Sequence, residues 1–323
     1  MDYRPGNNSH KVFYLTGFTS LGEHRRLLSI PFLFLLLYMT AANGIVTFVI
    51  ATQKKLHEPM YLLIGSLTLT SFFFPMFILP RMVISFASGR NDVRKEECLI
   101  QMFLVHWVGC FQSSILLQMA VDRFFAICWP LRYHSIVNLR NSIIFTAALA
   151  FRNTLTIVVK VGLFIPLTFC HTNKIYHCLC ETGSVVRLGC GNLQHNYIAG
   201  TVAFALTTSD CTLIALTYFI VFIVIFTNPS GESRQKAIHT CTTHLTVISV
   251  AYSSVLIAFI GYRVPKVHPD LKVLSTLGYL LVPSSCNPII YGMRTKEIKV
   301  HVIQLFKSDK VDSEKTQEGY SQK

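Results

Sequence analysis

Residues 27–51, LLSIPFLFLLLYMTAANGIVTFVIA, decide the fold class of this chain, because the stretch contains no charged residue. A helix that crosses the hydrocarbon core of a bilayer needs about 20 predominantly apolar residues. Arg26 precedes the stretch and Lys54 follows it, so both of its ends are polar. The stretch therefore predicts a membrane-spanning helix.

Further apolar stretches of similar length indicate that the chain crosses the membrane repeatedly. Hydrophobic residues make up 51% of the 323 residues and charged residues only 14%, which excludes an ordinary soluble enzyme and a disordered protein. Lipid admits only helices and closed barrels, and the alternating pattern of barrel strands is absent. We expect an all-α membrane protein, a seven-transmembrane helix bundle, with the later spans at Met60–Leu79, Leu99–Cys128, Ile143–Phe169, Tyr197–Thr227, Leu245–Tyr262 and Leu271–Tyr291.

The charge balance favours a membrane surface as a partner. Lysine and arginine number 29 against 16 acidic residues, which gives a net charge of +13. In a soluble chain this excess would suggest nucleic acid, but here it indicates basic segments beside membrane lipid, and we expect no nucleic-acid partner. Basic residues lie on both sides of the predicted membrane, so they do not orient the chain. Asn7 begins a glycosylation sequon, Asn7-Asn8-Ser9, which would place the N-terminus outside.

The cysteines point to an oxidising compartment on one side of the membrane. Five of the ten lie in the loops after the second and fourth spans, on the same side as Asn7: Cys98, Cys170, Cys178, Cys180 and Cys190. Five is an odd number, so one thiol should stay free or pair elsewhere. A zinc site of His171, His177, Cys178 and Cys180 is an alternative, but this spacing matches no standard structural site. We therefore expect no metal, and no catalytic motif or cofactor motif indicates an enzyme.

Five separated motifs carry a family resemblance that extends over nearly the whole chain. They are TGF (16–18), LHEPMY (56–61), MAVDRFFAIC (119–128), KAIHTCTTHL (236–245) and NPIIYGMRTKEI (287–298). Together they resemble the motif set of vertebrate olfactory receptors, within the rhodopsin-like G-protein-coupled receptors. AFRN (150–153), Asp210, and a loop with Arg263 and His268 resemble the class I, fish-like, receptors.

The resemblance implies a plasma-membrane receptor with an extracellular N-terminus. Such a receptor would bind a small polar or acidic odorant within the bundle and activate a stimulatory heterotrimeric G protein of the olfactory type. A receptor of the same fold for a non-olfactory metabolite or pheromone would share these features. A small-solute transporter is disfavoured, because Arg152, Lys160 and Asp210 look like isolated charges rather than a charged path.

The resemblance also divides the chain into four segments. Residues 1–26 would form the extracellular N-terminus and 27–291 the receptor domain. Residues 292–306 would form a short amphipathic cytoplasmic helix, and 307–323 a disordered cytoplasmic tail.

Several residues match the positions with which such receptors couple to a G protein and build their disulfides. Arg123 would pair with a carboxylate at rest and be released on activation. The expected coupling and switch residues are Asp122, Arg123, Tyr218, Lys236, His244 and Tyr291. The resemblance implies disulfides Cys98–Cys180 and Cys170–Cys190, with Cys178 left over, and an exchange of Cys178 for Cys180 stays open.

The resemblance implies a ligand pocket within the bundle, and helical spacing from Arg123 predicts the part of its wall that lies on the third span. The expected residues are Val105, His106, Gly109, Cys110 and Ser113 on the third span, Val202 and Leu206 on the fifth, and Tyr252, Val255 and Phe259 on the sixth. Arg263 is the candidate partner of an acidic odorant, and its alternative role is that of an arginine snorkelling to the membrane surface. Ser71 and Gln112 stand where the family usually has Asp and Glu, so a buried sodium ion would lack compensating charge.

Overall fold

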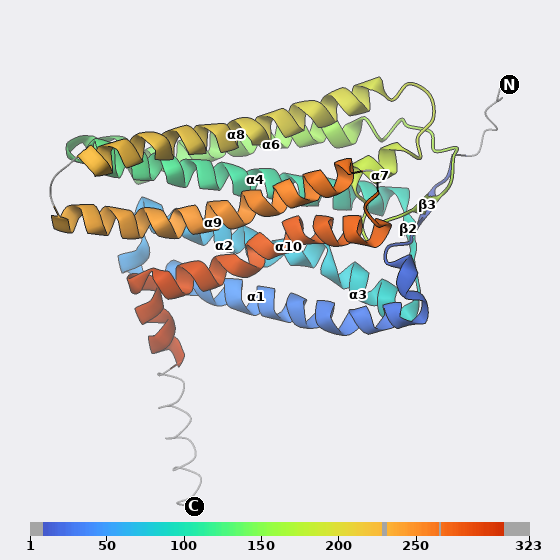
Figure 1. The fold of residues 1–323 in the computed structure, drawn as a ribbon, viewed down its shortest axis with the longest axis horizontal. Helices are drawn as coiled ribbons and strands as arrows, with labels where there is room; N and C mark the ends of the chain where they lie inside the picture. The colour runs from blue at the N-terminus through green and yellow to red at the C-terminus, as the bar shows by residue number, and fades with distance from the viewer. Residues whose placement is uncertain (1–8, 228–230, 265, 307–323) are drawn as a thin grey trace, which may run out of the picture.

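The computed structural model describes residues 9–227, 231–264 and 266–306. Its long helices lie side by side along the molecule (Figure 1). They are α1 (Ser29–Thr52), α2 (Pro59–Phe73), α3 (Leu79–Ser88), α4 (Lys95–Cys128), α6 (Leu139–Gly162), α8 (Gln194–Thr227), α9 (Gly231–Arg263) and α10 (Pro269–Arg294).

Short elements connect the long helices. The short helices are η1 (Thr19–Leu28), η2 (Lys54–Leu56), η3 (Phe74–Phe77), η4 (Pro130–Arg132), α5 (Tyr133–Ile136) and α7 (Thr182–Val186). The chain also forms three strands, β1 (Val12–Leu15), β2 (Asp92–Arg94) and β3 (Lys174–Ile175).

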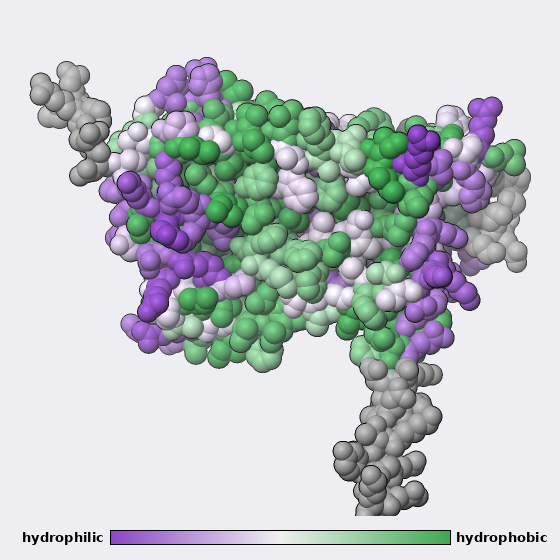
Figure 2. Space-filling view, turned by 180° about the vertical axis from the view of Figure 1, so that it is seen from behind, coloured by the Kyte–Doolittle hydropathy of each residue, from purple (hydrophilic) through white to green (hydrophobic). Residues whose placement is uncertain are grey.

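The expected seven-helix membrane bundle is confirmed. Within the described residues, seven helical segments are long and apolar enough to cross a membrane. On the face that Figure 2 shows, apolar side chains cover the middle of the molecule and polar ones gather at its two ends. We name these ends by their residues: the disulfide end contains Cys98 and Cys180, and the Arg123 end contains Arg123.

Three of the predicted spans differ clearly from the helices in the structure. The sixth begins at Gly231 rather than at Leu245. The second continues beyond Leu79 to Ser88 but is interrupted around Pro75, because proline has no backbone N–H to donate. The fourth ends at Gly162 rather than Phe169. Pro166 lies in the segment that follows the helix. Apolar residues of this segment, such as Phe164, pack into the core, so the sequence remains hydrophobic beyond the end of the helix.

The segment before α1 is folded onto the disulfide end. β1 pairs antiparallel with β2 and parallel with β3, which gives a three-stranded sheet of order β2-β1-β3. Phe13 and Leu15 of β1 are buried in the core of this end. The N-terminal segment therefore helps to fix both loops that close the bundle here.

A separate helix over residues 296–306 follows α10 and leaves the Arg123 end of the bundle (Figure 1). Thr295 has an extended backbone and separates the two helices, so residues 292–294 belong to α10 rather than to the expected short helix. Ile298 is buried against the bundle, whereas Val300, Ile303 and Phe306 are exposed. The exposed apolar side chains suit contact with lipid.

Candidate functional site

A cavity of about 730 Å³ lies toward the disulfide end, between α4, α8, α9 and α10. α6 and the loop before α7 contribute to its wall. Small-molecule sites typically measure roughly 300–1,000 Å³ and combine an apolar wall with few polar groups. Both the volume and the composition of this wall fit a small organic ligand.

Eight of the residues expected in the pocket line this cavity: Val105, His106, Gly109, Cys110, Ser113, Tyr252, Val255 and Phe259. A Cβ atom at Gly109 would meet nothing within 4 Å, so this glycine leaves open volume. The imidazole of His106 is hydrogen-bonded to the hydroxyl of Thr182. The periodicity of α4 therefore places the expected face toward the cavity.

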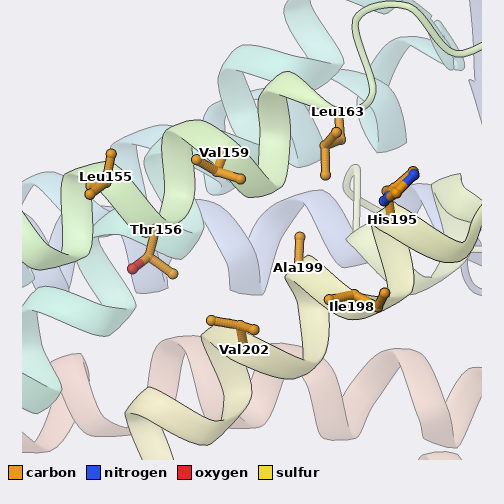
Figure 3. Close-up of a pocket in the computed structure, with 8 residues that line it drawn as sticks. All are labelled: Leu155, Thr156, Val159, Leu163, His195, Ile198, Ala199 and Val202. Carbon is orange, nitrogen blue, oxygen red and sulfur yellow. The ribbon is translucent and has the colours of Figure 1, made fainter.

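The prediction for α8 is wrong by one position of the helix. Val202 is half exposed and lies in a groove between α6 and α8, on the opposite side from Thr156 (Figure 3). Leu206 is absent from the cavity lining, to which α8 contributes Ala203 and Thr207 instead. Neighbouring helical positions differ by about 100° in direction, so a one-residue shift moves a side chain off the cavity.

Arg263 lies at the rim rather than in the wall of the cavity. It is the last residue of α9, its side chain is exposed, and its guanidinium carbon lies 4.7 Å from the centre of the Phe259 ring. Phe259 itself lines the cavity. The arginine thus stacks over the wall by a cation–π contact.

Two charged residues of the cavity wall, Lys160 and Glu181, were not predicted as ligand-contacting residues. Lys160 is only 8% exposed and lies on the face of α6 that also buries Asn153 and Ile157. These three positions are spaced as residues on one face of a helix, and this spacing could have predicted that Lys160 faces the interior of the bundle. Glu181 caps α7 by accepting a hydrogen bond from the backbone N–H of Ser184 at 2.8 Å.

Arg152 and Asp210, which look isolated in the sequence, form an ion pair between α6 and α8 in which Asp210 is buried and Arg152 partly exposed. The two guanidinium nitrogens of Arg152 lie 2.8 and 2.7 Å from the two carboxylate oxygens of Asp210. Ser114 of α4 accepts a hydrogen bond from Arg152 at 2.9 Å. The charges are therefore structural partners, which removes them as steps of a transport path.

The end of the cavity nearer Arg123 connects to a polar core. Ser113 and Tyr252 share a hydrogen bond of 2.9 Å, which joins α4 to α9. Next to it, the side-chain amides of Gln112 and Asn287 both donate to the hydroxyl of Ser71, at 3.2 and 3.1 Å. Uncharged hydrogen bonds thus join Ser71 and Gln112, the two positions at which the resemblance implies acids.

At the Arg123 end, Arg123 is paired with Asp122 at 3.1 Å, and Tyr133 donates to the other carboxylate oxygen at 2.9 Å. Burial and the adjacent carboxylate raise the pKa of Tyr133. Tyr291 is fully buried, with its hydroxyl 3.5 Å from Nδ1 of His244.

Tyr218 is also buried at this end, and its hydroxyl has no hydrogen-bond partner among the described residues. These side chains line one end of the core between α4, α8, α9 and α10. The side chain of Lys236 lies outside the described residues, as does Asn7.

The structure contains the disulfides Cys98–Cys180 and Cys170–Cys190 and leaves Cys178 as a buried free thiol. Burial raises the pKa of Cys178 to about 12. Because Cys180 is bonded to Cys98, the alternative zinc set is not assembled. Cys170, His171 and Cys190 do lie together, but the two sulfurs are bonded to each other.

Comparison with known proteins agrees with the class that this architecture defines. The fold is similar to that of squid rhodopsin, with a TM-score of 0.72 at 15% identity over 87% of this chain and 85% of that one. Human olfactory receptor 52A1 is 32% identical over 91% of this chain and 96% of its own length, and human olfactory receptor 52Z1P is 36% identical over 86% and 94%. The fold is therefore that of a rhodopsin-like, seven-helix receptor.

The family follows from the sequence comparison. The family model described as olfactory receptor matches residues 32–309. The chain belongs to the olfactory receptor family, a family of multi-pass G-protein-coupled receptors of the plasma membrane that are not enzymes. The resemblance stated from the motifs is confirmed, and the similarity to receptors of the 52 series is consistent with class I.

Proposed function

We propose that this receptor binds a small polar or acidic odorant in the 730 Å³ cavity and activates a stimulatory heterotrimeric G protein. One observation carries the proposal: the Ser113–Tyr252 hydrogen bond joins the cavity wall on α4 to that on α9. The same two helices carry Arg123 and His244 at the opposite end. A ligand that moves Tyr252 would therefore shift α9 relative to α4, a motion that can open the Arg123 end.

The proposed orientation places the disulfide end outside the cell and the Arg123 end in the cytoplasm. Disulfides form in oxidising compartments, and both bridges lie at one end of the bundle. Helix 296–306 then lies on the cytoplasmic side, where its exposed apolar residues would meet the membrane surface.

A cyclic AMP reporter assay tests this function. Cells that express the intact chain and the olfactory-type stimulatory G protein are exposed to short carboxylic acids, alcohols and amines. We expect a concentration-dependent rise in cyclic AMP that Ser113→Ala weakens, because this change removes the contact with Tyr252. Matched cells without the G protein should stay silent. A receptor at the cell surface that no polar compound activates would contradict the proposal.

The orientation is tested separately by labelling. A tag placed before residue 9 should be accessible to antibody on intact cells, whereas a tag after residue 306 should require permeabilised cells. The reverse pattern would contradict the proposed topology.

A further inference from the structure

Lys160 introduces a positive charge into the wall of the ligand cavity. It lies near the end of α6, is only 8% exposed, and lines the cavity together with His106 and Cys110. Ionisable residues within membrane helices are costly and usually face a partner in the bundle interior. Arg152, on the same helix, meets this requirement through Asp210.

Lys160 has no comparable partner. Among the described residues, no hydrogen bond is formed to its ammonium group and no acid lies within ion-pairing distance. Glu181 interacts with it electrostatically, but a carboxylate oxygen of Glu181 is engaged by the backbone N–H of Ser184 at 2.8 Å. The imidazole of His106 is likewise engaged, by Thr182. The three N–H donors of Lys160 are therefore available to a ligand.

The rest of the wall suits a hydrocarbon chain. Val255 and Phe259 of α9 and Leu280 of α10 line the same cavity. By contrast, the exposed Arg263 lies at the rim, where water and salt screen its charge. A ligand inside the cavity would thus meet one buried cation and an apolar surface.

We propose that Lys160 is the specificity-determining anchor of this receptor, which binds the carboxylate group of an unbranched aliphatic acid while the acyl chain lies along α9 and α10. The proposal deepens the proposed function and rests on it. It assigns the charge recognition to α6 and not to the arginine at the end of α9. A compact ammonium group can donate to a carboxylate in several orientations. It should therefore select for the carboxylate group of the ligand more strictly than for the length of its acyl chain.

Binding to the purified full-length receptor in lipid nanodiscs provides the test, because it does not require signalling. The unfolding temperature is measured with increasing concentrations of butanoate, hexanoate, octanoate, decanoate and oleate, and with the corresponding alcohols. We expect short or medium-length acids to raise the unfolding temperature and the alcohols to act more weakly. Stabilisation by oleate alone would indicate that the carboxylate comes from a membrane lipid and not from an odorant.

Substitutions distinguish the contribution of Lys160 to acid binding from that of the apolar cavity wall. Lys160→Met keeps an unbranched side chain, shorter by one heavy atom, but removes the charge, and should weaken binding of the acids roughly 10- to 100-fold while sparing the alcohols. Lys160→Arg keeps the charge and should retain the preference for acids. Arg263→Met is the matched control, with an expected effect of less than about threefold. If Lys160→Met does not reach the folded state, Lys160→Gln takes its place.

Three outcomes would overturn the inference: unchanged acid binding in Lys160→Met, loss of acid binding in Arg263→Met, or a wild-type receptor that no carboxylate stabilises. The reporter assay distinguishes this result from failure of the proposed function. Acids that bind through Lys160 without raising cyclic AMP would refute odorant signalling and leave the anchor in place. Acids that signal equally through wild type and Lys160→Met would refute the anchor alone.

Discussion

Arg123 forms an ion pair with the neighbouring Asp122 and remains partly exposed to solvent. Its guanidinium group lies 3.1 Å from one oxygen of Asp122, and Tyr133 donates to the other oxygen. Release of Arg123 would therefore leave the carboxylate with one of its two contacts. A guanidinium keeps its charge at any physiological pH, so the released group can bind a carboxylate or carbonyl of another protein.

We predict that Arg123→Ala abolishes the cyclic AMP response and leaves surface expression largely intact. The side chain is partly exposed, so its loss should affect coupling to the G protein more than packing. Cell-surface labelling and the reporter assay on the same cells measure the two effects. Arg132→Ala, a change of an exposed arginine beyond α4, is the control and should signal normally. A normal response from Arg123→Ala would show that Arg123 is not the switch residue.

A second residue, His177, should make the disulfide end sensitive to acid. It is buried in the loop between Cys170 and Cys180, and its Nδ1 accepts hydrogen bonds from the backbone N–H groups of Cys178 and Leu179. Burial lowers its pKa to about 4, so the folded protein holds the neutral form. Nδ1 can accept these bonds only while it is unprotonated.

We predict that the receptor loses stability as the pH falls from about 6.5 to 4. In this window the unfolded state binds more protons than the folded state, so the free energy of unfolding rises with pH. The expected loss is about 3 kcal/mol at most. Thermal unfolding in detergent across this range measures it, and His177→Asn should flatten this part of the curve. An equally steep curve for His177→Asn would assign the effect to other groups.

At the scale of the elements, an ion pair and a disulfide bond connect the helices and loops. α6, which buries little of its surface, is joined to α8 by the Arg152–Asp210 ion pair. The loop after α6 is tied to α4 by the Cys98–Cys180 bridge. The side-chain oxygen of Gln101 of α4 accepts a hydrogen bond from the backbone N–H of Cys180 at 2.9 Å. The ion pair fixes two neighbouring helices, and the disulfide fixes the loop after α6 next to the cavity.

We predict that Asp210→Asn destabilises the bundle by about 3 kcal/mol, because it leaves the guanidinium of Arg152 without its charged partner. The double variant Arg152→Met with Asp210→Leu should recover most of this loss, since both charges are then absent. Thermal unfolding in one detergent provides the comparison. If the double variant were less stable than Asp210→Asn, the ion pair would stabilise the bundle by more than the mutual neutralisation of its two charges.

We predict that Cys98→Ser and Cys180→Ser each prevent surface expression, whereas Cys178→Ser is tolerated. The bridge spans a sequence separation of 82 residues, and closing so long a loop restricts the unfolded chain by about 4 kcal/mol. Cys178 is a free buried thiol, so the serine variant loses only local packing. Surface labelling tests all three variants. Disulfide mapping that linked Cys98 to Cys178 would reverse the assignment.

At the scale of the whole molecule, the centre of the bundle is held by neutral hydrogen bonds. Ser71 of α2 accepts hydrogen bonds from Gln112 of α4 and Asn287 of α10, so three helices meet at one hydroxyl. Ser71 and Asn287 are buried, and Gln112 is partly buried. A hydroxyl and two amides supply oxygen atoms but no negative charge for a buried cation.

We predict that signalling is almost insensitive to replacement of sodium by a bulky organic cation at constant ionic strength. An uncompensated ion in this core would be penalised by several kcal/mol. Dose–response curves in the two salts measure the effect, and Ser71→Asp with Gln112→Glu should introduce a sodium dependence. A sodium-sensitive wild type, or a double variant indifferent to sodium, would contradict this account of the core.

The sequence determined the seven spans, the family and the face of α4 that lines the cavity. Hydropathy and helical periodicity are local properties, so they can be evaluated one segment at a time. The position of Arg123 then sets the register of Val105, His106 and Gly109 along a single continuous helix. Tyr218 defines the inward face of α8 in the same way, because Asp210 and Ala203 lie on the same buried face of the helix.

Which charges meet depends on the packing of the helices against one another. Arg152 and Asp210 lie 58 residues apart, and their pairing depends on how α6 and α8 are rotated against each other. The same rotation turns Lys160 into the cavity, whereas the end of α9 leaves Arg263 at its rim. Helix rotation results from packing among all the neighbouring helices, and the residue pattern of one helix does not contain it.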